Sequence, residues 1–418
     1  MSSVRSFVDL TGDTRATGRW IGRAARGVLR ARVRALRGRL RKQKIPDRTV
    51  HAAVRDFARL VEKLTPHWLD EAGGLAQGAE LTTEDILLLN SPPPEQRAAP
   101  PHCTGFVRVS KRENALLKIR DERNRVQQFL ILRGPDGTPL QGGRDIGNLG
   151  LAHAVSTRGL AGGNHTGSHT DRVPERPYLD DCHLLRYLVE RAGRVRDIPR
   201  LFDRLADASA AGGAGPDRGS IFLFVDAREA LLLETAGPHA AYKFLSRGTH
   251  AASNHYLLAR ARTWATQPPN KNTRRRYERM RELLKRARNR PGIADVFGLT
   301  RDRKYVPHAL CNDDQAHFWM TISAQYLVLD REDPQASLNW VCCGNTRHSV
   351  FLPVPLAERR TYRPLADGRF YRAADRLYRS HRCDRHLAAA QRSFERRALA
   401  DPDYGAQCTE AFDLVRGA

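Results

Sequence analysis

A proline-rich segment near residue 100 divides this chain into two parts of different character. The run SPPPEQRAAPPH, from Ser91 to His102, contains five prolines, and proline lacks the N–H group that helices and sheet ladders use. Before this run, apolar residues recur at helical spacing, and after it, short strand-like runs alternate with glycine turns. We therefore predict a helical front segment, an exposed extended connector and a strand-rich body.

The front segment is expected to begin with a basic amphipathic helix. The stretch from Arg15 to Lys44 contains twelve Lys and Arg residues and no acidic residue, so its charges have no partners within the stretch. These twelve residues account for half of the excess of Lys and Arg over Asp and Glu, which gives the chain a formal net charge of +24. A second amphipathic run covers Asp47 to Lys63, and a short helix is predicted near Thr83, with Thr82 or Thr83 as its N-cap.

Excess positive charge favours anionic partners of some kind. Packing of the basic helix on the body is the simplest interpretation, because no aromatic interleaving or recognition motif accompanies the charge. Nucleic acid is therefore a disfavoured partner. No run approaches the roughly 20 apolar residues that cross a bilayer and the start lacks an apolar signal core, so we expect a cytoplasmic protein without membrane contact. Seven cysteines without paired CxxC spacing indicate neither a disulfide framework nor a metal site.

The body alternates blocks of strands with blocks of helices, which predicts an α+β fold with antiparallel sheets. GPDG between two apolar runs predicts a hairpin near Gly137. Helices are expected over Leu179–Ala192, Ile198–Ala208 and Thr273–Asn289, and the basic tail from Leu356 to Ala418 is expected to be helical.

Cys103 stands where the connector meets the first strand, in HCTGFVRVS. A cysteine there can attack the preceding peptide carbonyl, form a thioester and become a new N-terminus after hydrolysis. Its free α-amine, with a reference pKa of about 7.7, can then serve as the base for its own thiol. A lone cysteine at a strand start is more often an inert small hydrophobe, so its position alone decides nothing.

An ordered series of motifs gives this cysteine a context. They are DEAGGLAQGAELTTEDILLLN at Asp70–Asn90, CTGF at Cys103–Phe106, KIRD at Lys118–Asp121, GLAGGN at Gly159–Asn164, SNHYL at Ser253–Leu257 and TISAQYLVLDRE at Thr321–Glu332. Together they resemble the acyl-coenzyme A:6-aminopenicillanic acid acyltransferase family of cysteine N-terminal-nucleophile hydrolases. The resemblance implies a four-layer αββα sandwich with antiparallel sheets. It also implies residues 1–102 as a helical pro-segment, 103–355 as the catalytic core and 356–418 as an extension.

The resemblance further implies roles for particular residues. Cys103 would be the nucleophile, with self-cleavage between His102 and Cys103, and Asp121 would order the new amine and the substrate carbonyl together with its neighbours. Asn254 would donate its side-chain amide to the oxyanion, a contribution of about 3 kcal/mol in other enzymes. Supporting positions are Lys118, Arg120, Asn164, His255 and Ser323. Two residues depart from the family pattern: His102 replaces a glycine, and Ile119 replaces a polar residue.

The predicted function is therefore that of a self-activated cysteine amidohydrolase or acyltransferase that works through a Cys103 thioester. No cofactor is required. The expected substrates are small amides, amines or thioesters such as an acyl-coenzyme A, and an acidic carrier protein is a further candidate partner. The two cleaved subunits are expected to stay associated. The alternative is a catalytically silent member of the same fold that binds anionic partners through its Arg-rich segments.

Overall fold

The computed structural model describes residues 6–91, 102–123, 126–174, 177–313, 319–380 and 385–417. The proline-rich connector from residue 92 to residue 101 lies outside these ranges, so its predicted extended form stays a prediction. The run HRCDRH from His381 to His386, which contains one of the seven cysteines, Cys383, also lies largely outside them.

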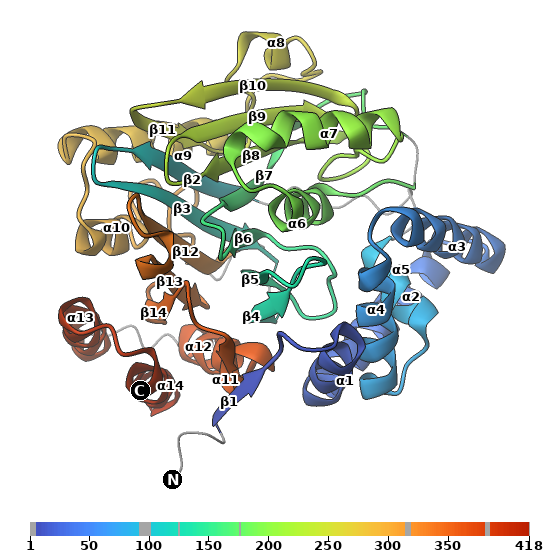
Figure 1. Ribbon diagram of the computed structural model, residues 1–418, viewed down its shortest axis with the longest axis horizontal. Helices are drawn as coiled ribbons and strands as arrows, with labels where there is room; N and C mark the ends of the chain where they lie inside the picture. Colours follow the sequence, from blue (N-terminus) through green and yellow to red (C-terminus); the bar gives the residue numbers. More distant parts are fainter. Residues whose placement is uncertain are drawn as a thin grey trace.

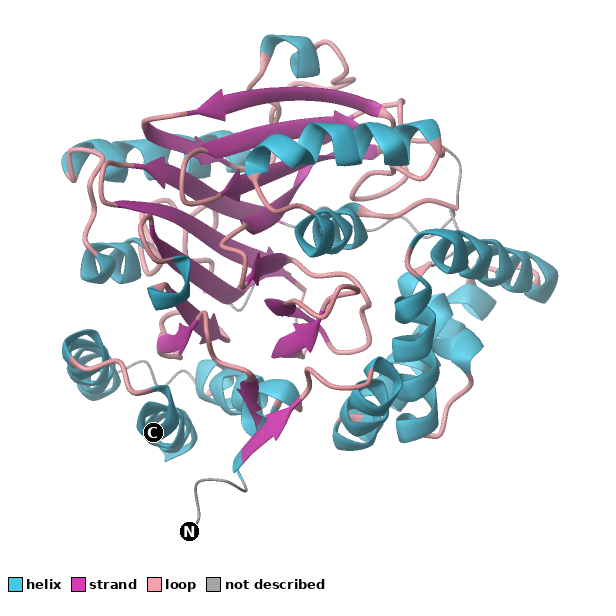
Figure 2. Ribbon diagram, viewed as in Figure 1, coloured by secondary structure: helices cyan, strands magenta, loops and turns pink. Residues whose placement is uncertain are grey.

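Two antiparallel sheets form the centre of the molecule (Figures 1 and 2). The larger sheet has the strand order β10 (His239–Leu245), β9 (Ala230–Ala236), β8 (Arg218–Val225), β7 (Ala161–His169), β6 (His153–Ser156), β5 (Pro139–Asp145) and β4 (Gln127–Arg133). The smaller sheet has the order β11 (Gly248–Ala252), β2 (His102–Val109), β3 (Glu113–Glu122), β12 (Met320–Asp330), β13 (Leu338–Cys343) and β14 (Leu352–Pro355). A separate pair joins β1 (Phe7–Asp9) to β15 (Arg360–Tyr362).

The two sheets pack face to face through apolar residues of alternating strand positions. Inward-facing side chains form one buried cluster, which includes Val107, Leu116, Ile221, Leu223 and Leu327. The intervening positions, among them Phe106, Leu117, Phe222 and Phe224, belong to the clusters under the helices. This period of two is the pattern that burial on both faces of a strand produces.

Helices cover the outer face of each sheet and complete four layers. The larger sheet is covered by α6 (Asp181–Arg191) and α7 (Ile198–Asp207), and the smaller one by α9 (Lys271–Arg286), α10 (Ile293–Leu299), α12 (Arg369–Arg379), α13 (Arg385–Ala400) and α14 (Tyr404–Gly417). Two short helices, α8 (Ala259–Arg262) and α11 (Arg363–Ala366), connect strands to these elements. The prediction of an α+β fold with antiparallel sheets is confirmed, and β4 and β5 form the predicted hairpin. The described part of the tail carries the strand β15, followed by the helices α11 to α14.

The front segment forms five helices at one end of the sandwich (Figure 1): α1 (Thr14–Ala24), α2 (Arg26–Lys42), α3 (Asp47–Leu64), α4 (Pro66–Ala79) and α5 (Thr83–Asn90). The predicted single basic helix is therefore two helices, with Ala25 at the junction. The predicted cap of the last helix is confirmed, because the Thr82 hydroxyl accepts from the backbone N–H of Asp85 and the Asp85 carboxylate accepts from that of Thr82.

The expectation that the charges of the basic stretch lack partners is wrong. Arg26 and Arg30 form ion pairs with Glu80, and Arg37 pairs with Asp85 at 2.7 Å. The sequence showed no acidic residue nearby because the partners follow about 50 residues later along the chain, where α4 ends and α5 begins. Only folding brings them beside α2.

Glycines let α1 and α4 pack at backbone contact. A Cβ atom at Gly74 would lie 2.1 Å from the carbonyl oxygen of Arg15, and one at Gly78 would lie 2.1 Å from that of Arg19. From the other helix, a Cβ at Gly22 would lie 2.3 Å from the carbonyl oxygen of Leu75. Contacts this short exclude any side chain, so Gly74 and Gly78 of the run from Asp70 to Asn90 have a packing role.

A buried ionic network joins the front segment to the body. Glu71 of α4 contacts Arg144 of β5 at 2.6 Å and Arg186 of α6 at 2.7 Å, and all three side chains are at most 1% exposed. Arg186 also contacts Glu190 at 2.7 Å. Burial alone would raise the pKa of Glu71, but the two guanidinium groups outweigh it and hold the pKa below its usual value.

No helix in the described part of the chain is long and apolar enough to cross a membrane.

Candidate active site

Cys103 lies at the start of β2, on the face that meets the larger sheet. It has the same strand parity as Val107, whose side chain packs between the sheets, and it is only 4% exposed. Its backbone N–H donates to Oδ1 of Asn254 at 2.8 Å, and its carbonyl oxygen accepts from Nη1 of Arg276 at 2.6 Å. Both polar groups of its backbone are therefore held by side chains from outside the strand.

Arg276 of α9 is the residue that links the site together. Its guanidinium donates to the carbonyl oxygen of Cys103, to Oγ1 of Thr104 at 2.6 Å and to Oδ1 of Asn254 at 2.7 Å. The Arg276 side chain is 1% exposed. Its burial lowers the pKa of the guanidinium below the usual value, although the negative charges of Asp121 and Cys103 act to raise it. Sequence analysis missed it, because it stands in the run Arg274-Arg275-Arg276 and nothing in that run distinguishes the buried arginine.

Asn254 follows β11 and is fixed in one orientation. Its Oδ1 atom accepts from two donors, the Cys103 N–H and Arg276, so this end of the amide must be the oxygen. Its Nδ2 group donates to the carbonyl oxygen of Thr166 at 2.9 Å, which uses one of its two hydrogens. Its backbone N–H donates to Oγ1 of Thr273 at 2.9 Å, in the first turn of α9.

His255, a predicted supporting residue, also contacts Thr273. Its Nδ1 atom lies 2.9 Å from the Thr273 hydroxyl oxygen. Burial, with the positive charge of Arg276, lowers the pKa of His255 to about 4, so the ring is neutral near pH 7. It therefore supports the position of Asn254 through a shared threonine.

The residues of KIRD separate onto two faces of β3. Asp121 lies on the face that carries Leu117 and Ile119, toward the helices, and its Oδ1 atom accepts from the Thr321 hydroxyl at 2.7 Å. Burial raises the pKa of Asp121 to about 7, although Arg276 and Lys118 oppose the shift. In the β2–β3 pairing Asp121 stands opposite His102, the residue before the predicted cleavage point.

Lys118 and Arg120 lie on the other face of β3, between the sheets. Arg120 donates to Oε1 of Gln127 at 2.6 Å and to Oδ1 of Asp145 at 2.7 Å, so its guanidinium serves the packing of β3 against the larger sheet. Lys118 is fully buried, and its Nζ atom has no hydrogen-bond partner among the described residues. Ser323 stands opposite Arg120 in the β3–β12 pairing, and its hydroxyl likewise has no partner in the described ranges.

Asn164 points away from Cys103. Its Nδ2 group donates to Sγ of Cys182 in the first turn of α6 at 3.3 Å. This direction follows from strand parity, because its neighbours Ala161 and Gly163 occupy the inward-facing positions of β7. The structure therefore groups Cys103 with Asn254 and Arg276, and places the Asn164 side chain under the helix. Asp121 lies on the opposite face of the sheet, where the charge of Arg276 acts on it.

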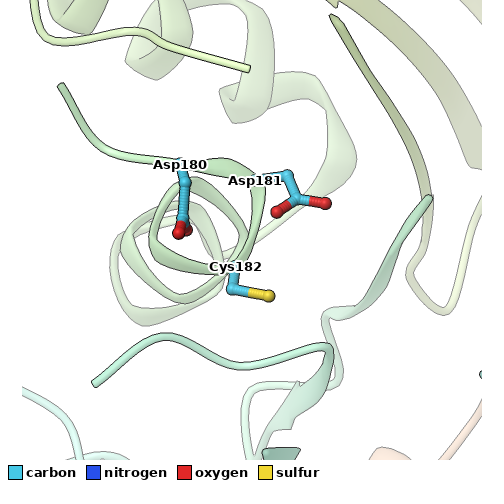
Figure 3. Close-up of side chains that lie close together, drawn as sticks. All are labelled: Asp180, Asp181 and Cys182. Carbon is cyan, nitrogen blue, oxygen red and sulfur yellow. The ribbon is translucent and has the colours of Figure 1, made fainter. Parts of the chain in front are cut away.

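One group of possible metal ligands occurs in the described residues, at the start of α6 (Figure 3). The ligand atoms of Asp180, Asp181 and Cys182 lie within 4.8 Å of one another. Asp180 caps the helix by accepting from the backbone N–H of His183 at 3.0 Å. Burial and the Asp180 charge raise the pKa of Asp181 to about 6, while Lys118 and Arg120 supply nearby positive charge. These carboxylates already have local partners, so the group does not define a metal centre.

The chain matches no protein-family model, and no curated protein matches it. Among solved structures, it is similar to penicillin V acylase from Agrobacterium tumefaciens, with 14% identity, a TM-score of 0.39 and coverage of 61% of this chain and 87% of that chain. Two variants of the conjugated bile acid hydrolase from Clostridium perfringens align with TM-scores of 0.39, identities of 9% and 10%, and coverage of 61% of this chain and 92% and 93% of theirs. With TM-scores below 0.5 these likenesses do not establish a family, and the fold assignment rests on the sheet topology above.

Proposed function

We propose that this chain is an enzyme that makes or cleaves amide bonds with a cysteine nucleophile, and that it first cleaves itself between His102 and Cys103. The observation that carries the proposal is the pair of contacts on the Cys103 backbone, whose N–H is held by Asn254 and whose carbonyl is held by Arg276. A strand residue normally pairs its backbone groups with a neighbouring strand. Side-chain partners at this one residue keep its amide nitrogen in a fixed position before and after the bond is cut.

The self-cleavage step needs only the chain and water. The Cys103 sulfur attacks the carbonyl carbon of His102, the peptide C–N bond breaks, and the thiol proton passes to the departing nitrogen, giving a thioester and a free amine. Water then hydrolyses the thioester to a His102 carboxylate and a regenerated thiol. Asn254 supports this step because its Oδ1 atom already accepts from the nitrogen that becomes the amine.

The same atoms then act on a substrate. The α-amine of Cys103, with a reference pKa of about 7.7, accepts the thiol proton as the sulfur attacks an amide or thioester carbonyl. The C–N or C–S bond of the substrate then breaks, and the α-ammonium group gives the proton to the departing amine or thiolate. The acyl-thioester that remains on Cys103 passes its acyl group to water or to an amine, which regenerates the thiol. Lys118 is the candidate for orienting the acyl substrate, because a buried amino group without a hydrogen-bond partner in the described ranges favours a ligand that supplies an acceptor.

Trapping the acyl-enzyme tests this function. The purified protein would be mixed with a panel of acyl-coenzyme A thioesters and N-acyl p-nitroanilides, quenched in acid, and analysed by peptide mass spectrometry. We expect an acyl adduct on the peptide that begins at Cys103. Adducts confined to other cysteines, with turnover intact, would rule out the proposed nucleophile.

Asn254→Ala is expected to lower kcat by about 100-fold or more, because a side-chain donor at the oxyanion acts chiefly in the transition state. The variant also loses the acceptor for the Cys103 N–H, so self-cleavage should slow as well. The matched control is Asn164→Ala, which removes the same chemical group from a position directed at α6. We expect that control to change kcat less than about threefold by the same assay. An equal loss in both variants would contradict the assignment.

The raised pKa of Asp121 predicts that the free energy of unfolding decreases as the pH rises. Its pKa is about 7 in the folded chain, whereas an unfolded aspartate titrates near 3.9. Between these values the folded state binds a proton that the unfolded state does not, so the free energy of unfolding falls as the pH rises from about 4 to 7. The difference is on the order of 4 kcal/mol, at about 1.4 kcal/mol per pKa unit.

Urea unfolding of the wild type and of Asp121→Asn at about pH 5 and pH 8 measures the part of this effect that lies above pH 5, about 3 kcal/mol. The asparagine keeps an acceptor for Thr321 but cannot ionise, so the variant should lose much less stability over the interval. Glu234, whose pKa burial also raises to about 7, contributes with the same sign in both proteins and therefore cancels in the comparison. Identical slopes for the two proteins would show that Asp121 ionises normally.

A further inference from the structure

A pocket of about 580 Å³ lies between α10 and α13, on the outer side of the smaller sheet. Pockets that bind small molecules commonly have volumes of about 300–1,000 Å³. None of its lining residues is among the hydrogen-bonding partners of Cys103 described above. One of its two walls belongs to the C-terminal helices, to which the sequence assigned no function.

The floor of the pocket is apolar and fixed. Phe297 of α10 stacks on Phe351, with ring centroids 4.2 Å apart and an interplanar angle of 3°. Ala294, Ala388 and Leu399 extend this surface along both helices. At Gly298 an added Cβ atom would meet nothing within 4 Å, so the missing side chain leaves room in the pocket.

The pocket walls carry four arginines and one glutamate, and part of this charge is already paired. Glu395 is 4% exposed, and its two oxygens accept from Arg301 at 2.6 and 2.8 Å. One of them also accepts from the backbone N–H of Phe351 at 3.2 Å. Arg347 pairs with Asp313. The only acidic side chain in the lining is therefore neutralised within the protein.

Arg392 and Arg396 are different, because in the described ranges neither has a carboxylate within ion-pair distance. They lie one turn apart on α13, both are exposed, and both line the pocket. Gln391, beside them, donates to the carbonyl oxygens of Arg347 and Ser349 at 2.9 Å and so anchors this part of α13 to the body. The guanidinium groups of Arg392 and Arg396, which have no carboxylate partner in the described ranges, therefore line the same pocket as the apolar surface around Phe297.

We propose that this pocket binds a small amphipathic anion, namely a carboxylate or phosphate monoester that carries a compact apolar body. The body lies on Phe297 and the alanines, and the anionic group reaches Arg392 and Arg396, whose planar donors suit both oxyanions. The proposal goes beyond the amide chemistry at Cys103, since it concerns a second site made from the C-terminal helices.

Isothermal titration calorimetry on the full chain tests the proposal. The protein would carry Cys103→Ala, so that neither self-cleavage nor turnover contributes heat. The probes are 4-phenylbutyrate and 2-phenylethyl phosphate, with 4-phenylbutanol as the neutral analogue. We expect at least one anion to bind with a Kd at least tenfold lower than that of the alcohol. The tighter of the two anions identifies the preferred headgroup.

Three variants locate the site. Gly298→Leu, which fills the pocket and suits a helix better than glycine, should abolish binding of the anion. Arg392→Gln combined with Arg396→Gln should weaken it at least tenfold. Arg397→Gln removes the same charge from the same helix outside the pocket and should change the Kd less than twofold. Circular dichroism melting of each variant would confirm that the fold is retained.

Three results would overturn the proposal. They are absence of binding by both anions at millimolar concentration, equal binding of the alcohol, and anion binding that Gly298→Leu leaves unchanged. The last result would place the anion at another site, such as the surroundings of Cys103.

Discussion

Cys103→Ala will remain a single chain without activity, whereas the wild-type protein will be recovered as two polypeptides, residues 1–102 and 103–418. The reason is that the sulfur of Cys103 is the attacking atom in both the cleavage and the catalytic step, and alanine removes it without adding bulk to a buried strand position. A denaturing gel shows the number of chains, and intact-mass analysis fixes the cleavage point to one bond. The expected effect is a complete loss of cleavage and of turnover.

Cys182→Ala is the matched control, because it removes another free thiol, which lies at the start of α6 and contacts Asn164. It should cleave and turn over at rates close to those of the wild type. An uncut wild-type chain that is nevertheless active would contradict the maturation step. A wild type that is both uncut and inactive would instead favour the alternative of a silent binding module for anionic partners.

Glu71→Gln is expected to lower the free energy of unfolding by about 3–5 kcal/mol, the usual cost of removing one partner from a buried ion pair. The substitution keeps the shape of the side chain but removes the buried negative charge that faces both Arg144 and Arg186, and Glu190 then remains beside Arg186. Because Glu71 belongs to the front segment and both arginines belong to the body, cleavage would turn this network into a contact between subunits. Urea unfolding monitored by circular dichroism measures the loss of stability.

The control for this experiment is Glu80→Gln, at the other end of α4. Glu80 also pairs with two arginines, Arg26 and Arg30, but its side chain is 55% exposed. Exposed pairs of this kind contribute about 0–1 kcal/mol, so the two variants remove the same charge at very different expected cost. Gel filtration of the cleaved proteins should show that the subunits stay together in the control and separate more readily in Glu71→Gln. Equal stability of the two variants would show that the buried network does not hold the front segment.

Much of the fold could be predicted because it depends on local patterns. The short continuous apolar run in GSIFLFVDA and the helical spacing in Asp47–Lys63 correspond to the elements β8 and α3, with nearly the same bounds. The cap at Thr82 needs only residues three positions apart. In contrast, the hairpin strands β9, β10 and β11 were not predicted, since ALLLETA and HAAYKFL fit a strand or a short helix equally well by sequence.

The candidate site is less completely predictable from the sequence. The motif KIRD suggests one cluster of side chains, but the alternation of any strand places Lys118 and Arg120 on the opposite face from Asp121. The same alternation directs Asn164 toward α6. These two consequences follow from strand geometry once the strands are assigned.

Local sequence patterns are enough to predict the class of fold, the proline-rich break and the cysteine that follows it, because each depends on residues close together along the chain. The partners of the charged residues, in contrast, depend on the tertiary fold. Arg276 reaches the Cys103 carbonyl across 173 residues, and it is buried while the arginines beside it are not. The basic helix α2 likewise obtains its partners from Glu80 and Asp85. The composition gives the number of charged residues. Which of them form ion pairs or become buried depends on their distances in space, and these distances are determined by the fold.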